Sequence, residues 1–435
     1  MTRVAMTTRG WIVTFAGLGI NLALGVLYSW SVIAKTLSKP IAESGWGWSA
    51  GQASLPYAIG VGVFALSMVF AGRAQDRFGP RIVATFGGAL CGVGLIVASF
   101  GTAENGLPLV FGFGVFTGLG IGLGYAAATP AAVKWFPPNR KGLITGLVVA
   151  GFGLASVYIA PLTTWLLQTQ QVGGTFRVLG VAFFVVTVLL AQLLVNPPAD
   201  YLPAEARKPA EARSRGKVPS GATSSETGAD YDWREMVHTR QFALLWLMYA
   251  FSAFAGLMII GHMAKIAAAQ LPSFDLGFLL VAVLAIGNAA GRVVAGLAAD
   301  RIGGVRTMLI VFVTQAVMMG VLAVSNTPLA LVPVAAAVGF CYGANLSLFP
   351  STTAGYFGTK HLGVNYGLVF TAWGVGGVFG SMTAGTIVDS TGTYGISYAI
   401  AAVLCVVAAS LTFATKPPAP RAEPVHLPRR REHAA

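Results

Sequence analysis

The chain has 435 residues, of which 55% are hydrophobic and only 10% are charged, and its mean hydropathy is +0.71. A soluble chain carries about a quarter charged residues, so this composition excludes a soluble globular protein and predicts a polytopic membrane protein. The formal net charge is +13, but the cations flank hydrophobic spans, which favours a membrane surface over nucleic acid as their partner.

Hydropathy predicts an all-α membrane protein with about twelve transmembrane helices in two sets of six. Residues 197–240, rich in Pro, Ala, Ser and charge, separate the sets and are typical of a disordered connector. The predicted organisation is an N-terminal six-helix bundle (1–196), a cytoplasmic connector (197–240), a C-terminal six-helix bundle (241–416) and a basic cytoplasmic tail (417–435). The predicted spans are 10–33, 51–71, 81–100, 107–132, 142–167, 176–196, 241–264, 276–299, 306–325, 328–352, 365–388 and 394–415.

The distribution of lysine and arginine predicts the orientation of the spans. With a cytoplasmic N-terminus, only Lys35, Lys39, Arg177 and Lys265 fall on external segments. Both termini are therefore expected in the cytoplasm, with the chain a multi-pass monomer among the lipids of the cell (inner) membrane. The short basic start runs into a full-length span, which is typical of a retained first helix.

The two halves of the sequence repeat each other. GRAQDRFGPR (Gly72–Arg81), after the second span, returns as GLAADRIGGVR (Gly296–Arg306) after the eighth. KWFPPNRKGLITGL (Lys134–Leu147), after the fourth span, is echoed by GYFGTKHLGVNYGLVF (Gly355–Phe370) after the tenth. The nearly constant spacing indicates a duplicated six-helix unit, and repeated bundles with a site between them are the architecture of secondary transporters.

One charged residue lies in the interior of a predicted span, away from its ends. Arg292 is within residues 276–299, whereas the fifteen Asp and Glu fall in loops, tails or at span ends. A guanidinium within a bilayer is costly, so Arg292 is expected to face a watery cavity and to carry function. Asn288 lies one helical turn away on the same face. Because no carboxylate of the spans is available as counter-ion, the missing partner is predicted to be the cargo, a small organic anion.

Other kinds of site have no support in the sequence. Cys91, Cys341 and Cys405 lie in apolar spans, which argues against a disulfide framework or a loop-built metal site. The glycines of residues 118–124 lack the strand and helix that flank a nucleotide-binding loop, and predict helix packing. No ATP-binding motif, paired carboxylates or metalloprotease motif is found. We therefore expect no cofactor, no metal and no enzymatic activity.

The repeated loop motif resembles that of the major facilitator superfamily. The G-x-x-x-D-R-x-G signature stands between spans two and three and again between spans eight and nine. The resemblance implies two pseudo-symmetric six-helix bundles, and ion pairs that lock the cytoplasmic side when the site faces outward. Without the resemblance, the charged residues of the motif could equally serve only to orient the spans, as cytoplasmic positive charge, and to cap helices. The gating residues implied are Asp76, Arg77, Arg81, Asp300, Arg301 and Arg306.

Several stretches resemble the oxalate/formate antiporter and monocarboxylate porter branch of that superfamily. In that branch the arginine at the position of Arg292 binds the substrate carboxylate. Oxalate-specific members have a second cation, a lysine, at the position of Trp373. One cation with an indole suits a single carboxylate and a small apolar remainder, so the resemblance favours a monocarboxylate such as lactate. The stretches are GVLYSW (Gly25–Trp30), DRFGPR (Asp76–Arg81), KWFP (Lys134–Pro137), NAAGRVVAGLAADRIG (Asn288–Gly303) and SLFPS (Ser347–Ser351).

Polar side chains within the spans are the remaining candidates for substrate binding. Tyr28 and Tyr125 lie where the branch places pocket aromatics, and a hydroxyl is a good donor to a carboxylate. A helix–helix hydrogen bond is their alternative role. Tyr342 and Asn345 share one face of the tenth span. Asn288 either binds substrate or holds the arginine.

His262, near the outer end of the seventh span, is the only histidine in a span and the candidate for proton coupling. Histidine titrates in the physiological range, but a lone histidine is often a structural hydrogen-bonding residue. The sequence therefore predicts a secondary transporter that carries a lactate-like monocarboxylate by alternating access, in symport with H⁺. The alternatives are an anion exchanger of the oxalate/formate type and a non-transporting membrane anion sensor.

Overall fold

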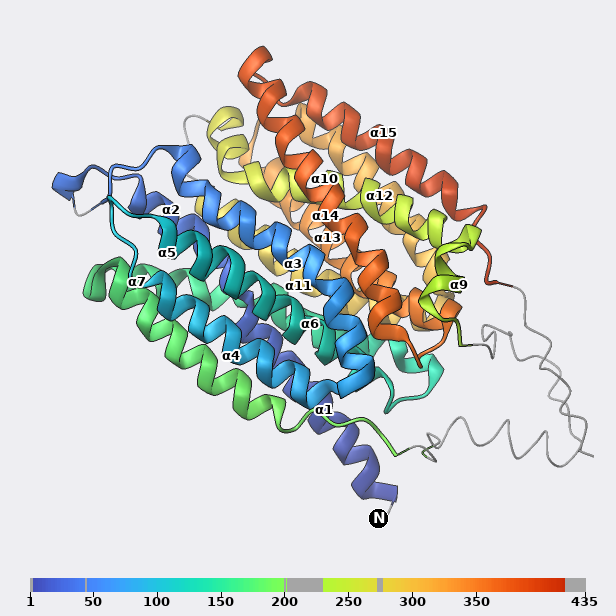
Figure 1. The fold of residues 1–435 in the computed structure, drawn as a ribbon. Helices are drawn as coiled ribbons and strands as arrows, with labels where there is room; N and C mark the ends of the chain where they lie inside the picture. The colour runs from blue at the N-terminus through green and yellow to red at the C-terminus, as the bar shows by residue number, and fades with distance from the viewer. Residues whose placement is uncertain (1–2, 44, 199–200, 202–229, 272–276, 419–435) are drawn as a thin grey trace, which may run out of the picture.

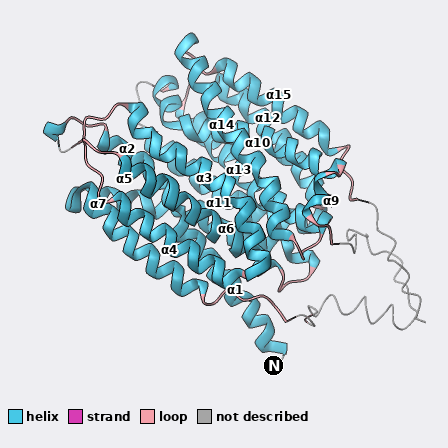
Figure 2. Cartoon of the chain, viewed as in Figure 1, coloured by secondary structure: helices cyan, strands magenta, loops and turns pink. Residues whose placement is uncertain are grey.

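The computed structural model describes residues 3–43, 45–198, 201, 230–271 and 277–418. Every regular element within these residues is a helix (Figure 2), which confirms the predicted all-α class. Most of the connector (199–200 and 202–229) and most of the basic tail (419–435) lie outside the described residues, so their predicted character stays a prediction.

The N-terminal half consists of apolar helices that are interrupted at defined points. The first span changes from α-helix to 3-10 helix at Gly25, where a Cβ would lie 2.1 Å from the Cβ of Ala155. The fourth span contains one π-helical segment, η3. The elements are α1 (Arg3–Leu24), η1 (Gly25–Ser29), α2 (Trp30–Leu37), η2 (Ile41–Glu43), α3 (Ala50–Phe78), α4 (Pro80–Ala98), α5 (Leu107–Leu109), η3 (Val110–Thr117), α6 (Gly118–Val133), η4 (Pro138–Arg140) and α7 (Lys141–Ala191).

α7 contains two of the predicted spans. Its 51 residues would form a single helix about 75 Å long, far longer than the ~30 Å hydrocarbon core of a bilayer. The helix is broken at Gln171, whose φ of 57° is not helical. Eleven helices of the described chain are long and apolar enough to cross a membrane, and the break in α7 accounts for the twelfth predicted span.

The C-terminal half begins with a short helix and continues with six long ones. Thr239 caps α10, because its side chain accepts a hydrogen bond from the Phe242 amide. The elements are α9 (Trp233–Val237), α10 (Arg240–Gln270), α11 (Gly277–Ile302), α12 (Gly304–Val324), α13 (Pro328–Phe357), α14 (Leu362–Thr391) and α15 (Gly395–Thr412).

The repeated loop motif folds in the same way in both halves. Gly79 separates α3 from α4 with a φ of 85°, and Gly303 separates α11 from α12 with a φ of 92°. This region of backbone conformation is open to glycine and costly for other residues, so each motif turns the chain sharply between two helices. The sequence repeat therefore corresponds to a structural repeat.

The helices of the two halves lie side by side with similar inclination (Figure 1). The start of α1, helix α9 and the end of α15 lie at one end of the bundle, called here the α9 end. Helices α2 and α5 lie at the opposite end, called the α2 end. α7 packs against α11, and α14 packs against α3, so two long helix pairs join the halves.

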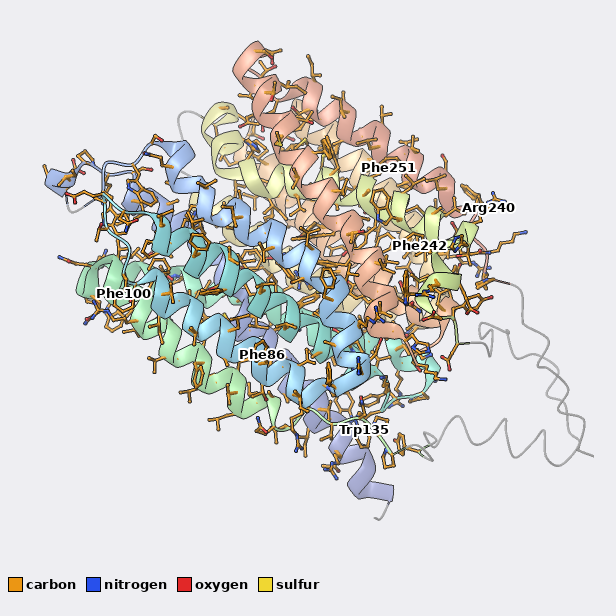
Figure 3. The ribbon with its side chains drawn as sticks, viewed as in Figure 1. Phe86, Phe100, Trp135, Arg240, Phe242 and Phe251 are labelled. Atoms are coloured by element: carbon orange, nitrogen blue, oxygen red, sulfur yellow. The ribbon has the colours of Figure 1, made fainter. Side chains whose placement is uncertain are left out.

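The outer surface is apolar over much of the helical region. Phe86 in α4 is 62% exposed and Phe100, just after α4, is 70% exposed; both lie on the outside of the N-terminal half (Figure 3). Such exposure of large apolar side chains is expected where lipid replaces water around the protein.

The two described ends of the connector contact opposite halves. Tyr201 donates its hydroxyl to the carbonyl oxygen of Trp135 at 3.1 Å, beside the α6–α7 loop (Figure 3). Tyr231 donates its amide to the carbonyl oxygen of Phe357 at 3.0 Å, at the end of α13. The connector is thus fixed at both ends to the α9 end of the bundle.

Candidate substrate site

Arg292 is completely buried and is the largest such side chain in the described chain. Its Nε donates to Oδ1 of Asn288, one turn earlier in α11, at 3.0 Å. Its Nη1 donates to the carbonyl oxygen of Val149 in α7, across the two halves. Its Nη2 is buried without a hydrogen-bond partner. Asn288 therefore contacts and orients the guanidinium, which is one of the two roles considered for it. The Nη2 group of Arg292 stays open.

Glycines in α7 make room for this arginine. A Cβ on Gly153 would lie 3.1 Å from Nε and 3.3 Å from Cζ of Arg292. A Cβ on Gly146 would lie 2.3 Å from the Arg292 carbonyl oxygen. Small residues allow membrane helices to approach closely, and here the close approach brings the guanidinium within reach of the opposite half.

A small cavity lies against Arg292, between the two halves. Four predicted residues line it: Tyr28 and Tyr125 from the N-terminal half, Tyr342 and Trp373 from the C-terminal half. No acidic residue of the described chain lines it. Sequence reasoning missed four further lining residues, namely Phe64, Phe152, Leu346 and Phe370.

The missed aromatic residues form a cage around the cavity. The ring of Phe64 lies 5.7 Å from that of Tyr125, 5.5 Å from that of Phe370 and 5.7 Å from that of Trp373. A phenylalanine in an apolar span looks the same whether it packs in the core or lines a site. Only the spacing of Phe370 and Trp373, which share a face of α14, could have indicated one of them.

The indole of Trp373 fixes the neighbouring phenol. Its Nε1 donates to the hydroxyl oxygen of Tyr342 at 3.0 Å. Since this oxygen accepts from the indole, the hydroxyl hydrogen of Tyr342 stays available to donate to an anion. The cavity therefore combines a guanidinium, hydroxyl donors and aromatic walls, a combination suited to a carboxylate with a small apolar remainder.

A second cavity lies on the α2-end side of the first and shares Tyr28 with it. Asn288 faces this second cavity. The other lining residues are mainly apolar. They are Ser156, Ile260, Met263, Val281, Leu284 and Ala285.

Two predicted residues line neither cavity. Asn345 is 1% exposed in α13, and neither its Nδ2 nor its Oδ1 has a hydrogen-bond partner. The Nδ1 of His262 lies 3.3 Å from the hydroxyl of Tyr394, at the start of α15. His262 therefore contacts another segment of its own half, and the structure does not bring it to Arg292.

The α9 end is closed by two aspartates that reach across the halves. Asp300 of α11 accepts hydrogen bonds from the amides of Gly142 and Leu143 at 2.7 and 2.8 Å, at the start of α7. Asp76 of α3 accepts from the amides of Gly363 and Val364 at 3.3 and 3.1 Å, at the start of α14. Each carboxylate caps a helix of the opposite half, where the helix dipole favours negative charge.

The hydrogen bonds of the two aspartates across the halves are made to backbone amides. The ion pairs that the family resemblance implied for the gate stay a prediction, and the motif arginines lie at the surface. Those arginines are exposed: Arg77, Arg81, Arg301 and Arg306.

Glycine pairs hold the caps in place. A Cβ on Gly296 would lie 2.2 Å from the carbonyl oxygen of Gly142, and a Cβ on Gly72 would lie 2.0 Å from that of Gly363. Only residues without side chains allow the backbones of α11 and α7, or of α3 and α14, to cross so closely. The two repeated motifs therefore build two matching closures.

Comparison with known proteins identifies relatives along nearly the whole chain. A family model described as Major Facilitator Superfamily matches residues 10–279 and 262–434. An uncharacterized MFS-type transporter, YhjX, of Escherichia coli (strain K12) is 29% identical over 377 residues, covering 85% of this chain and 86% of the relative. The oxalate:formate antiporter of Oxalobacter formigenes is 27% identical over 392 residues, covering 89% and 86%. Monocarboxylate transporter 13 of Bos taurus is 27% identical over 395 residues, covering 90% and 86%.

Solved structures share the architecture. The proton:xylose symporter XylE superposes with a TM-score of 0.70 at 13% identity, covering 95% of this chain and 96% of that chain. The Escherichia coli fucose:proton symporter FucP gives a TM-score of 0.66 at 13% identity, covering 93% and 98%. At this identity the likeness concerns the fold alone. It confirms the predicted architecture, and the sequence relatives confirm the resemblance to the oxalate/formate and monocarboxylate branch.

Proposed function

The chain belongs to the major facilitator superfamily, and from this membership and the cavity at Arg292 we propose that it carries a small, lactate-like monocarboxylate across the membrane by alternating access. The observation that carries the proposal is the buried guanidinium, whose Nη2 is open in a cavity without an acidic residue. A buried charge needs a partner, and a carboxylate is the partner whose geometry matches a guanidinium.

The cavity favours a single carboxylate. One cation faces it, and Phe64, Phe152 and Phe370 contribute apolar rings to its lining. A dicarboxylate would leave its second charge against these apolar rings, at a high desolvation cost. A substrate with one carboxylate and a methyl-sized remainder matches a lining of one cation, hydroxyl donors and apolar rings.

Binding couples the substrate to closure of the site. A carboxylate held by Arg292 and Tyr342 of one half would accept further hydrogen bonds from Tyr28 and Tyr125 of the other. Because these contacts form fully only when the halves close, the loaded protein favours closure, as required for a ligand that biases a two-state equilibrium. The moving units are residues 1–196 and 241–416.

We place the α9 end in the cytoplasm. The turns between α3 and α4 and between α11 and α12, which carry the exposed motif arginines, lie there, and cytoplasmic segments carry the excess of Lys and Arg. Both termini then lie in the cytoplasm. The proposed protein is a monomer in the inner membrane. In this orientation the cytoplasmic side is closed by the Asp76 and Asp300 caps, and the second cavity lies on the external side of the first.

Transport of the anion requires compensation of its charge. Moving a monoanion into a cell that is negative inside costs about 2.3 kcal/mol per 100 mV. We propose proton symport, with the proton accompanying the carboxylate and His262 acting as a relay near the external end. Anion exchange is the second candidate, favoured by the likeness to an oxalate:formate antiporter.

Uptake into proteoliposomes tests these proposals. Labelled lactate, formate and oxalate would be supplied with and without an inward proton gradient, and with and without internal lactate. Proton symport predicts gradient-driven accumulation of lactate into vesicles without internal anion. Uptake that needs an internal anion and ignores the gradient would establish exchange. Specific binding without transport in either mode would identify an anion sensor.

A further inference from the structure

We propose that the hydroxyls of Tyr125, Tyr249 and Tyr366, called here the hydroxyl cluster, form a second carboxylate subsite on the cytoplasmic side of the Arg292 cavity. This subsite would receive the anion as it leaves the guanidinium. The inference rests on the proposed function, because it concerns the next position of the same substrate.

The hydroxyl cluster is buried and unsatisfied. Tyr249 is 0% exposed, Tyr125 2% and Tyr366 3%. The Tyr366 hydroxyl interacts with those of Tyr125 and Tyr249, but outside ordinary hydrogen-bond geometry, so none of the three oxygens has a well-formed hydrogen bond. A buried hydroxyl without a partner lowers stability. Three such groups brought together from three helices are therefore better explained by a transient ligand than by packing.

Tyr125 lines the cavity, and the ring of Phe370 lies between the cavity and the other two members of the hydroxyl cluster. It stacks on Trp373 at 4.9 Å on the cavity side. It also lies 5.7 Å from the ring of Tyr366 and 6.2 Å from that of Tyr249. Along α14 the order from the α9 end is Tyr366, Phe370 and Trp373. The cluster thus extends from the cavity toward the closed cytoplasmic end.

The hydroxyl cluster is divided between the two halves. Tyr125 comes from α6, whereas Tyr249 and Tyr366 come from α10 and α14. Phe370 crosses the same boundary, with its ring 5.5 Å from that of Phe64 and 5.8 Å from that of Tyr125. Any rocking of the halves that opens the cytoplasmic side must separate these groups, so the subsite becomes accessible at the time of release.

The chemistry of the hydroxyl cluster suits release. Hydroxyl donors bind a carboxylate, but neutral donors hold an anion more weakly than a guanidinium does. An unpartnered amide is also near: Asn345 lies one turn from Phe349 on the same face of α13, and the Phe349 ring stacks on Tyr249 at 4.0 Å. An anion would thus pass from a charged site to a neutral one and then to water, with falling affinity.

The test uses the double variant Tyr249→Phe/Tyr366→Phe in proteoliposomes with a known orientation. Lactate exchange is measured at equal pH on both sides, and the half-saturating lactate concentration is determined separately for each face. Tyr398→Phe is the matched control, because Tyr398 is 2% exposed with an unpartnered hydroxyl in α15. Melting temperatures check that all variants fold.

The double variant is expected to raise the half-saturating concentration at the cytoplasmic face about thirtyfold, the effect of losing two net hydrogen bonds, and to leave the external value unchanged. The control should change neither. Equal shifts at both faces, or none, would overturn the subsite and assign the hydroxyls to packing or water. Failure of the proposed function would be distinguishable from failure of the subsite, because the parent protein would then show no saturable lactate exchange that depends on Arg292.

Discussion

The guanidinium of Arg292 in α11 donates a hydrogen bond to the carbonyl oxygen of Val149 in α7, and so connects the two halves at the substrate site. Of the five N–H donors of the guanidinium, one is engaged by this carbonyl and one by Asn288, so a carboxylate replaces a protein partner only when it takes one of these two. Since Asn288 belongs to the same helix as Arg292, replacing Val149 is the change that alters the contact between halves. Substrate binding and domain movement therefore use the same side chain.

Gly153→Ala should weaken monocarboxylate binding. The added methyl group would lie 3.1 Å from Nε of Arg292, tighter than ordinary contact, so the guanidinium must shift from the cavity. Overpacking of this kind costs about 1–3 kcal/mol, or roughly 5- to 150-fold in affinity. Gly62→Ala is the control, because its methyl group would meet nothing within 4 Å. Titration of purified protein with lactate measures both, and equal affinities would contradict the proposed position of the substrate.

Asp300→Ala should open the cytoplasmic side. Loss of a helix cap costs about 0.5–2 kcal/mol, which shifts the population roughly 2- to 30-fold toward the inward-open state. Spin labels at Arg73 and Ile302, which are exposed on opposite halves, report the opening as a longer distance. The three buried native cysteines should not compete for the label. Glu104→Ala, at an exposed position outside the closure, is the control; an unchanged distance distribution in Asp300→Ala would show that the cap does not hold the gate.

Trp373→Lys should change the preference among acids. It places a second cation in the cavity and removes the Nε1 donor that fixes Tyr342. Lactate binding should weaken and oxalate binding should improve relative to the parent. Trp373→Phe removes the indole donor and part of the ring without adding a cation, and should keep the order of preference. The measurement is competition of unlabelled lactate and oxalate with labelled lactate. The same preference order in the parent and in both variants would mean that Trp373 does not contact the substrate.

His262→Ala should reduce gradient-driven uptake more than exchange at equal pH. Arg292 does not release its proton at physiological pH, so a relay must be another group, and imidazole titrates in this range. Tyr394→Phe removes only the hydroxyl partner of His262 and tests whether orientation of the ring matters. Equal losses in both transport modes would assign His262 to packing at the external end.

Much of the architecture followed from the sequence because it depends on composition and repetition. Hydropathy located the spans, and the recurrence around Asp76 and Asp300 predicted the structural repeat. The lining role of Phe64 and Phe370 was not predictable, because apolar aromatic side chains suit both core and cavity. The interdomain caps were also hidden, since their donors are backbone amides such as that of Gly142, which no side-chain pattern reveals.

The sharpest test of the substrate site is direct binding of labelled lactate to purified protein in which Arg292 is replaced by Lys or by Ala. Lysine keeps the charge but lacks the planar pair of donors, so both variants should lose about 3 kcal/mol or more, a roughly hundredfold weaker affinity. Melting temperatures would establish that the variants are folded. A hundredfold loss in both variants is the predicted result; near-parental affinity in either would contradict the assignment of Arg292 as the carboxylate-binding residue.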